Sequence, residues 1–180
     1  MLFHATHALI LYALKYNLLH PDLFRTSLAL GANIKRLEKQ LDDLLPQSQL
    51  ATTIASITGF GLVCSTELAA EIGTMQRFAT EASLARYIGI APLDNSSGVF
   101  TGTKGYKQVN RRAKAAMMVA AARHYYHTPQ SKAYYDKKRA EGKKHNQAVR
   151  SLARHLSRVV WSLVKNNKLY QKDLNWVKSA

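Results

Sequence analysis

Apolar residues recur three and four positions apart through most of this sequence, which is the spacing of one face of an α-helix. Residues that interrupt helices are few, with nine glycines and four prolines among 180 residues. A β-sandwich needs many turns and therefore many such residues. We predict an all-α fold, and the hydrophobic fraction of 47% excludes wholesale disorder.

The longest regular pattern lies in residues 23–44. Its positions alternate in steps of four and three, and they are Leu23, Ser27, Leu30, Ile34, Leu37, Leu41 and Leu44. This a/d heptad over about three repeats is typical of a coiled coil. Two interpretations stay open: the helix pairs with a second copy, giving a homo-oligomer, or it packs on its own domain. We divide the chain into a helical arm (1–47), a domain (48–170) and a polar tail (171–180).

Charge divides sharply along the chain. Residues 1–100 contain 7 Lys/Arg and 8 Asp/Glu, a net charge of −1. Residues 101–180 contain 19 Lys/Arg and 3 Asp/Glu, a net charge of +16, and the whole chain therefore carries +15. We expect this part to repel itself until a polyanion binds, and its field favours nucleic-acid phosphates. A membrane-surface helix and a solvated basic surface are the alternatives.

Several other classes of protein are disfavoured. One cysteine excludes a disulfide scaffold and a cysteine-based zinc cluster. No group of acids accompanies the histidines, so we predict no metal site, and there is no P-loop or Rossmann fingerprint. The most apolar stretch, residues 2–14, is shorter than the roughly 20 residues of a membrane span. We expect a soluble, cytoplasmic, nucleoid-associated protein.

Residues 49–72 are predicted to form two short apolar helices joined by Thr58-Gly59-Phe60-Gly61. A Gly-x-Gly turn is typical of a helix-hairpin-helix, in which glycines let backbone amides approach a phosphate. Gly59 and Gly61 are therefore candidate nucleic-acid contacts. An ordinary helical hairpin is the alternative.

Residues 93–105 are predicted to form a loop that is long for a compact domain. It contains Ser96-Ser97-Gly98, and a serine there could attack a phosphodiester if it were activated and flanked by cations. An ordinary turn is the alternative. A helix follows from Gln108 to His127. The candidate nucleic-acid contacts in and before it are Lys104, Lys107, Asn110, Arg111, Arg112, Lys114 and Arg123.

Together these segments resemble a known family. The runs that carry the resemblance are Ile57-Thr58-Gly59-Phe60-Gly61, Glu67-Leu68-Ala69-Ala70-Glu71-Ile72-Gly73 with Arg77-Phe78, Leu84-Ala85-Arg86-Tyr87-Ile88-Gly89-Ile90-Ala91-Pro92, and Ser97-Gly98 followed by Lys107, Asn110 and Arg111. Their order and spacing, over residues 56–170, resemble the C-terminal domain of insertion-sequence transposases that pair a Holliday-junction-resolvase-like DEDD domain with a serine-bearing domain. Some members are guided by a bridge RNA. Residues 1–47 are similar to the coiled-coil linker of that family.

The resemblance implies DNA transposition, with DNA and, in some members, guide RNA as partners. It makes Ser97 the nucleophile that forms a covalent phosphoserine, with Ser96 as the adjacent alternative. The chain departs from the family at Val109, where glycine is usual, and at Lys114, where arginine is usual. We expect no cofactor in this chain, because Mg²⁺ belongs to the acidic domain. Without that domain we expect a domain piece or truncated frame that is inactive alone. A non-catalytic nucleic-acid-binding module and an oligomerisation module are the alternatives.

Overall fold

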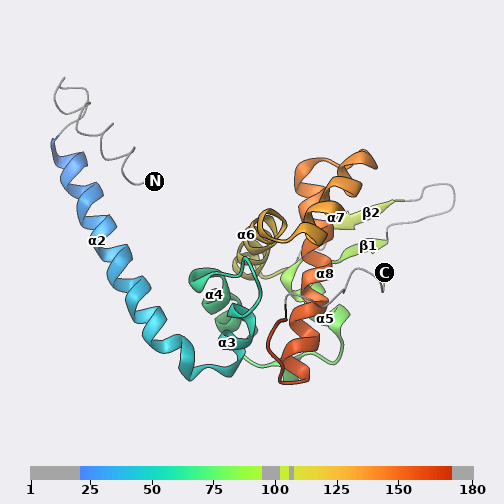
Figure 1. Ribbon diagram of the computed structural model, residues 1–180, viewed down its shortest axis with the longest axis horizontal. Helices are drawn as coiled ribbons and strands as arrows, with labels where there is room; N and C mark the ends of the chain where they lie inside the picture. Colours follow the sequence, from blue (N-terminus) through green and yellow to red (C-terminus); the bar gives the residue numbers. More distant parts are fainter. Residues whose placement is uncertain (1–20, 95–101, 106–107, 172–180) are drawn as a thin grey trace. The chain divides into compact units, whose positions relative to one another are not determined.

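Helices account for most of the chain that the computed structural model describes, which comprises residues 21–94, 102–105 and 108–171 (Figure 1). In chain order the elements are α2 (Pro21–Leu44), the 3₁₀ helix η1 (Leu45–Gln47), α3 (Gln49–Ala55), α4 (Leu62–Ile72), the 3₁₀ helix η2 (Met75–Arg77), α5 (Glu81–Ile88), the strands β1 (Pro92–Asp94) and β2 (Thr103–Gly105), α6 (Arg111–His127), α7 (Pro129–Ala140) and α8 (His145–Lys165). The prediction of an all-α fold is confirmed, with one short strand pair added. Contacts divide the chain into two units between Leu41 and Asp42.

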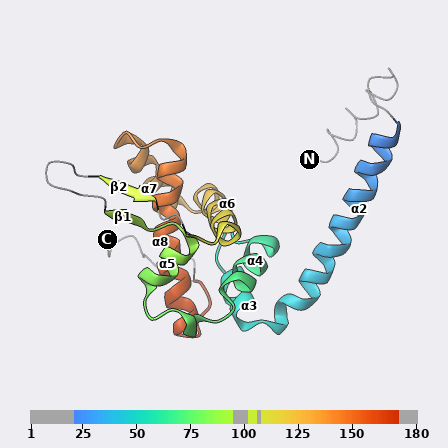
Figure 2. The same ribbon diagram turned by 180° about the vertical axis from the view of Figure 1, so that it is seen from behind.

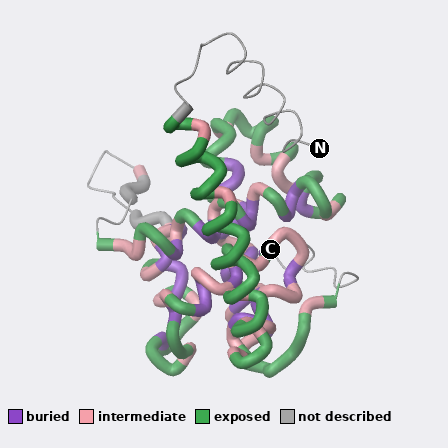
Figure 3. The backbone as a smooth tube through the Cα atoms, turned by 90° about the vertical axis from the view of Figure 1, so that its left-hand side faces the viewer, coloured by how far each residue is buried: buried purple, intermediate pink, exposed green. Residues whose placement is uncertain are grey.

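Helix α2 runs without a break for 24 residues, which confirms the helix predicted over residues 23–44. Its a/d side chains are exposed except for Leu41, which is half-buried, and Leu30, Ile34 and Leu37 are between 53% and 57% accessible. The backbone tube of α2 is coloured as exposed along nearly all of its length (Figure 3). The helix gives way to η1 at Pro46, since proline lacks the N–H that would continue the hydrogen-bond ladder. The coiled coil itself stays a prediction.

The segment from α3 to α4 contains the two helices predicted over residues 49–72. Ser48 begins α3 by accepting a 3.2 Å hydrogen bond from the Ala51 N–H. Gly59 in the turn has φ +85°, and a Cβ there would lie 2.6 Å from the backbone nitrogen of His124 in α6. Only glycine fits that position. Gly61, by contrast, is an exposed N-cap whose added Cβ would meet nothing within 4 Å.

Helix α5 is closed at both ends by local signals. Thr80 and Ser83 cap its start reciprocally, and Gly89 ends it in the left-handed conformation with φ +80°. Strands β1 and β2 follow and pair antiparallel, with Leu93 opposite Lys104. The prediction that residues 93–105 form only a loop is therefore wrong at both ends. Three-residue strands were not recognisable, because so short a run shows no alternation of apolar and polar residues.

The hydrophobic core lies around α6 and α8. Helix α6 packs against α4, α7 and α8, and α8 also packs against α3 and α5 (Figures 1 and 2). The buried face of α6 is rich in alanine, which lets neighbouring helices approach closely. Large side chains from the other elements fill the rest of the core. Those that are almost fully buried include Ile54, Ile57, Phe60, Leu68, Ile72, Leu84, Ile88, Leu152 and Leu156.

Polar groups also take part in this packing. Glu81 in the first turn of α5 accepts hydrogen bonds from Arg154 and Ser157 of α8, and its carboxylate lies 3.8 Å from Arg158. His124 in α6 is fully buried, and its pKa is lowered to about 4 by burial and, less, by nearby His127. Its imidazole is therefore neutral at pH 7.

None of the helices in the described part of the chain is both long enough and apolar enough to cross a membrane.

The two glycines of the 56–61 turn give a matched test of this packing. We expect Gly59→Ser to lower the free energy of unfolding by about 2 kcal/mol or more, since the φ is unfavourable and the new Cβ meets the α6 backbone. Gly61→Ser should be neutral or slightly stabilising, because serine is a good N-cap and the site is open. Urea denaturation of both variants is the measurement. Equal effects would contradict the close approach of α6 to Gly59.

Candidate nucleic-acid interface

Helices α4 and α6 run antiparallel, and most of the predicted contact residues lie on or beside this pair. Arg112, in the first turn of α6, lies 2.6 Å from Glu67 in the middle of α4 and 3.2 Å from Glu71 in its last turn. At the other end, the α6 backbone at His124 touches Gly59, just before α4 begins. The two ends of the helix pair are therefore joined differently. At one end Arg112 pairs with two carboxylates, and at the other the α6 backbone packs directly on a glycine.

Asn110 joins three helices at the start of α6. Its side-chain oxygen caps α6 by accepting a 2.9 Å hydrogen bond from the Ala113 N–H. Its amide nitrogen donates to the Glu71 carboxylate of α4 and, at 2.8 Å, to the Tyr87 hydroxyl of α5. The Asn110 backbone N–H donates to the Tyr87 carbonyl at 2.9 Å. The predicted nucleic-acid contact is thus occupied by protein partners.

Tyr87 and Arg77 complete this network, and sequence reasoning did not select either as a site residue. The Tyr87 hydroxyl donates a 2.8 Å hydrogen bond to the carbonyl of Glu71. The Arg77 guanidinium donates to the Glu71 and Ile72 carbonyls at the end of α4, and lies 5.2 Å from the centre of the Tyr87 ring. The sequence signal that could have pointed to this network is the pair of glutamates one turn apart, which are the charged residues of α4.

The serine segment lies between the two paired strands. Ser97, Ser96 and Lys107 fall outside the described residues, and Lys104 is known only as a backbone position in β2. The described residues on either side are held together, because the Asn110 N–H bonds the Tyr87 carbonyl and Pro92 pairs with Gly105. Tyr87 and Asn110, which flank this part of the chain, therefore lie side by side.

The N-terminal end of α4 brings Gly61 and Arg123 into one neighbourhood. Arg123 of α6 is exposed, and its charge acts on the Cys64 thiol in the first turn of α4. The pKa of Cys64 is raised by burial, which outweighs the lowering effect of Arg123. The thiol is therefore protonated at neutral pH. This open helix end and the arginine can both favour a negative charge.

The remaining cations of α6 differ in whether a carboxylate binds them. Arg111 is exposed, Lys114 is half-buried, and no ion pair to either is found among the described residues. Arg112 is exposed but held by Glu67 and Glu71, which raise its pKa through a hydrogen bond and charge. Acids from the first half of the chain thus pair with Arg112 and Arg154 of the basic half, and the repulsion within that half stays a prediction.

Comparison with known proteins identifies the family of this domain. Residues 51–136 match the sequence model of the "Transposase IS116/IS110/IS902 family". The chain carries a domain of this transposase family. The matched residues run from α3 into α7 and include the serine segment and all of α6.

Curated relatives of this transposase domain extend the likeness to most of the chain. The chain is 34% identical over 150 residues to the "Insertion element IS900 uncharacterized 42 kDa protein" of Mycobacterium paratuberculosis, covering 82% of this chain and 38% of that protein. It is 32% identical over 155 residues to the IS110 "uncharacterized 43.6 kDa protein" of Streptomyces coelicolor, covering 86% and 38%. It is also 32% identical over 150 residues to the IS116 "uncharacterized 44.8 kDa protein" of Streptomyces clavuligerus, covering 83% and 38%. The match thus spans under two fifths of each relative's length.

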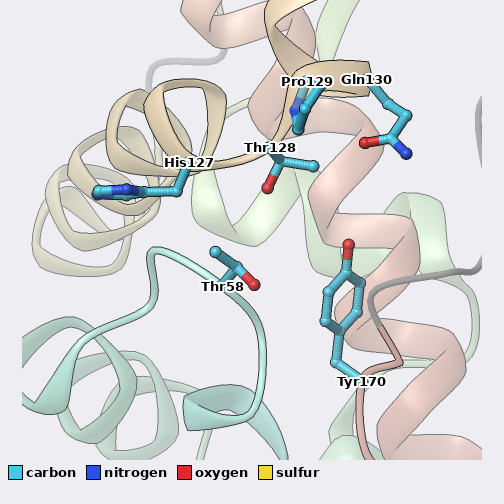
Figure 4. Close-up of a pocket in the computed structure, with 6 residues that line it drawn as sticks. All are labelled: Thr58, His127, Thr128, Pro129, Gln130 and Tyr170. Carbon is cyan, nitrogen blue, oxygen red and sulfur yellow. The ribbon is translucent and has the colours of Figure 1, made fainter.

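One pocket lies beside the glycine turn of the transposase domain. It is lined by Thr58, His127, Thr128, Pro129, Gln130 and Tyr170, and it holds about 140 Å³ (Figure 4). Tyr170 forms one wall because its backbone N–H donates to Ser56 at 2.9 Å, and its hydroxyl points toward the start of α7. Such a volume is smaller than the pockets that hold organic cofactors.

No cluster of three or more His, Cys, Asp or Glu side chains suited to a metal ion occurs in the described part of the transposase domain. Its glutamates at α4 and α5 are already bound by arginines. These residues do not fit a Mg²⁺ site.

Asn110 offers a test of whether this network is structural. We expect Asn110→Ala to lower the free energy of unfolding by about 1–2 kcal/mol, since it removes a helix cap and two hydrogen bonds. Lys114→Ala, one turn further along α6, should change it by less than about 0.5 kcal/mol. Both are measured by urea denaturation. An Asn110→Ala variant of unchanged stability but weakened nucleic-acid binding would place Asn110 on the ligand surface instead.

Proposed function

We propose that this chain supplies the strand-exchange part of an insertion-element transposase, with Ser97 as the nucleophile that acts on DNA. The observation that carries the proposal is the family match over residues 51–136, which includes the Ser96-Ser97-Gly98 segment. The paired strands on either side and the hydrogen-bonded start of α6 support it, because they hold the described residues that flank the segment close together.

The chemistry proposed for Ser97 is a reversible transesterification. The serine Oγ attacks phosphorus in the DNA backbone, an O–P bond forms, and the bond from phosphorus to the leaving sugar oxygen breaks. The hydroxyl proton leaves Oγ, and the leaving oxygen gains a proton. The phosphoserine ester conserves the bond, so that a sugar hydroxyl of another strand can attack it and release the serine. Cations near the phosphate would stabilise the extra negative charge.

Phosphate contacts are proposed for those cations of α6 to which no ion pair is found among the described residues, and for two lysines next to the serine segment. Arg111, Lys114 and Arg123 lie along α6, and Lys104 and Lys107 adjoin the serine segment. Arg112 contributes less directly, since Glu67 and Glu71 bind its guanidinium. Gly61 remains open to a phosphate at the N-terminal end of α4, whereas the space in front of Gly59 is filled by α6. A guide RNA would use the same phosphate chemistry.

Mg²⁺ is proposed to belong to an acidic domain of the complete transposase, because the described residues offer no site for it. We propose that this chain is inactive until such a domain is supplied.

A second candidate function is nucleic-acid binding without catalysis. It is favoured by the extent of the match: the matched segments make up 38% of each relative, so that most of each relative lies outside them.

An adduct experiment separates the two functions. The chain is combined, in cis or in trans, with the acidic domain of a family member, and a covalent protein–DNA adduct is sought on denaturing gels. We expect an adduct with wild type and Ser96→Ala and none with Ser97→Ala. An adduct that survives Ser97→Ala but not Ser96→Ala would identify the other serine, and one that survives both would remove catalysis from this segment.

The arm is proposed to form a homo-oligomer through residues 23–44. The exposed a/d side chains of α2 support this, because burial against a partner helix removes apolar surface from water. We expect Leu37→Asp to lower the mass in solution, measured by light scattering, while Ala32→Asp, at an f position, leaves it unchanged. A wild-type chain that is monomeric at high concentration would sink this part of the proposal.

A further inference from the structure

Four aromatic rings from three helices form one column at the C-terminal end of α6. The ring centres of Tyr126 and Tyr125 lie 4.3 Å apart, and those of Tyr125 and Tyr135 lie 4.4 Å apart with only 5° between the planes. His145, the first residue of α8, meets Tyr135 edge-on at 5.7 Å, and its Nδ1 is 2.8 Å from the Tyr135 hydroxyl. The column therefore links α6, α7 and α8.

Tyr126 is the outer end of this column. It is 73% exposed, whereas Tyr125 behind it is 7% exposed. An exposed tyrosine normally samples several rotamers, and fixing it on binding costs conformational entropy. Here the ring already rests on a buried ring, so that this cost is reduced. The outer face of Tyr126 is a flat, pre-oriented aromatic surface.

Two cations lie near this surface. Arg123 lies three residues before Tyr126, on the same side of α6, and is exposed. Lys132 of α7 interacts electrostatically with Tyr126 and pairs with Asp136 at 2.9 Å. Burial, followed by a hydrogen bond that the Tyr125 hydroxyl donates to Tyr126, raises the pKa of Tyr125 to about 12. That phenol therefore stays neutral and adds no charge that would repel a phosphate.

The same exposed face of α6 continues toward the start of the helix. Its exposed residues are Arg111, Arg112, Ala115, Val119, Arg123 and Tyr126, of which Arg112 is held by Glu67 and Glu71. The small side chains in the middle leave room for a ligand to lie close to the helix, between an arginine at one end and an arginine and a ring at the other.

We propose that Tyr126 is a stacking platform for an unpaired nucleobase, with Arg123 binding the phosphate beside it. The proposal rests on the proposed function and deepens it, since it names the state of the strand that this surface accepts. Inside a duplex both faces of each base are covered by its neighbours, so that an unpaired base, but not one inside a duplex, can cover the ring. Strand exchange requires paired strands to separate, which supplies such bases. The positive charge of the surface favours a nucleic acid over an apolar protein partner.

The test compares variants of the full chain that differ only in the ring. Fluorescence anisotropy measures the affinity for a single strand of DNA, for the RNA of the same sequence, and for the blunt DNA duplex. We expect Tyr126→Leu to weaken single-strand binding by about 5- to 150-fold, because a base–aromatic stack is lost, and to leave duplex binding unchanged. Tyr126→Phe should retain wild-type affinity. Leu169→Ala, which shortens an exposed apolar side chain outside α6, is the control and should also retain it.

Two further measurements make the assignment direct. Irradiation of a strand that carries 5-iodouracil should cross-link wild type and Tyr126→Phe but not Tyr126→Leu, and the DNA and RNA versions show which strand is preferred. An oligonucleotide with abasic sites should bind wild type and Tyr126→Leu equally, since no base is left to stack. Arg123→Gln should weaken single-strand and duplex binding alike and reduce the salt dependence.

The outcomes distinguish this inference from the proposed function. Equal single-strand affinity of Tyr126→Leu and wild type would overturn the platform while leaving phosphate binding and the serine adduct intact. A change of mass in solution on Tyr126→Leu, without a change in affinity, would also overturn it and make the surface a protein contact. Absence of any nucleic-acid binding would instead defeat the proposed function.

Discussion

The approach of α6 to the turn before α4 is the contact on which the arrangement of the domain depends. The α6 backbone at His124 lies so close to Gly59 that no side chain fits between them. Several of the buried side chains of α6 are alanines, which are small. Helix α4 can therefore lie antiparallel along α6, and α8 can pack on another side of it. This places Arg123 near the N-terminal end of α4 and Arg112 near the glutamates at its other end.

A second constraint is electrostatic. The chain carries a formal net charge of +15, and its basic residues are concentrated after residue 100. Folding brings Glu67, Glu71 and Glu81 from the first half against Arg112 and Arg154 of the second. These pairs fix helices to one another, whereas the cations of α6 without such partners remain available to a ligand. Position in the fold, rather than charge alone, therefore separates structural arginines from candidate phosphate contacts.

The network at Asn110 connects the helical body to the strand pair. One asparagine caps α6, binds Glu71 of α4 and holds Tyr87 of α5 by side chain and backbone. These contacts leave Asn110 few free hydrogen-bonding groups for a ligand. The aromatic column at the far end of α6 has the opposite character, since its last ring faces solvent. The two ends of one helix thus suit different tasks.

Local sequence determined the helices and most of their ends. Thr80 and Gly89 bound α5, Pro46 interrupts the end of α2, and the apolar spacing of 3.6 residues identified α8, because caps, breakers and periodicity act within a few residues. The family resemblance also came from the sequence, since it depends on the order of motifs, and the match over residues 51–136 agrees with it. Only the tertiary structure decided that Gly59 faces a helix backbone, that Asn110 and Arg112 are held by glutamates, and that Tyr126 ends a column of rings. Each of these is a contact between residues far apart in the chain or between helices, and neither propensity nor spacing carries information about which distant group will fill the space beside a side chain.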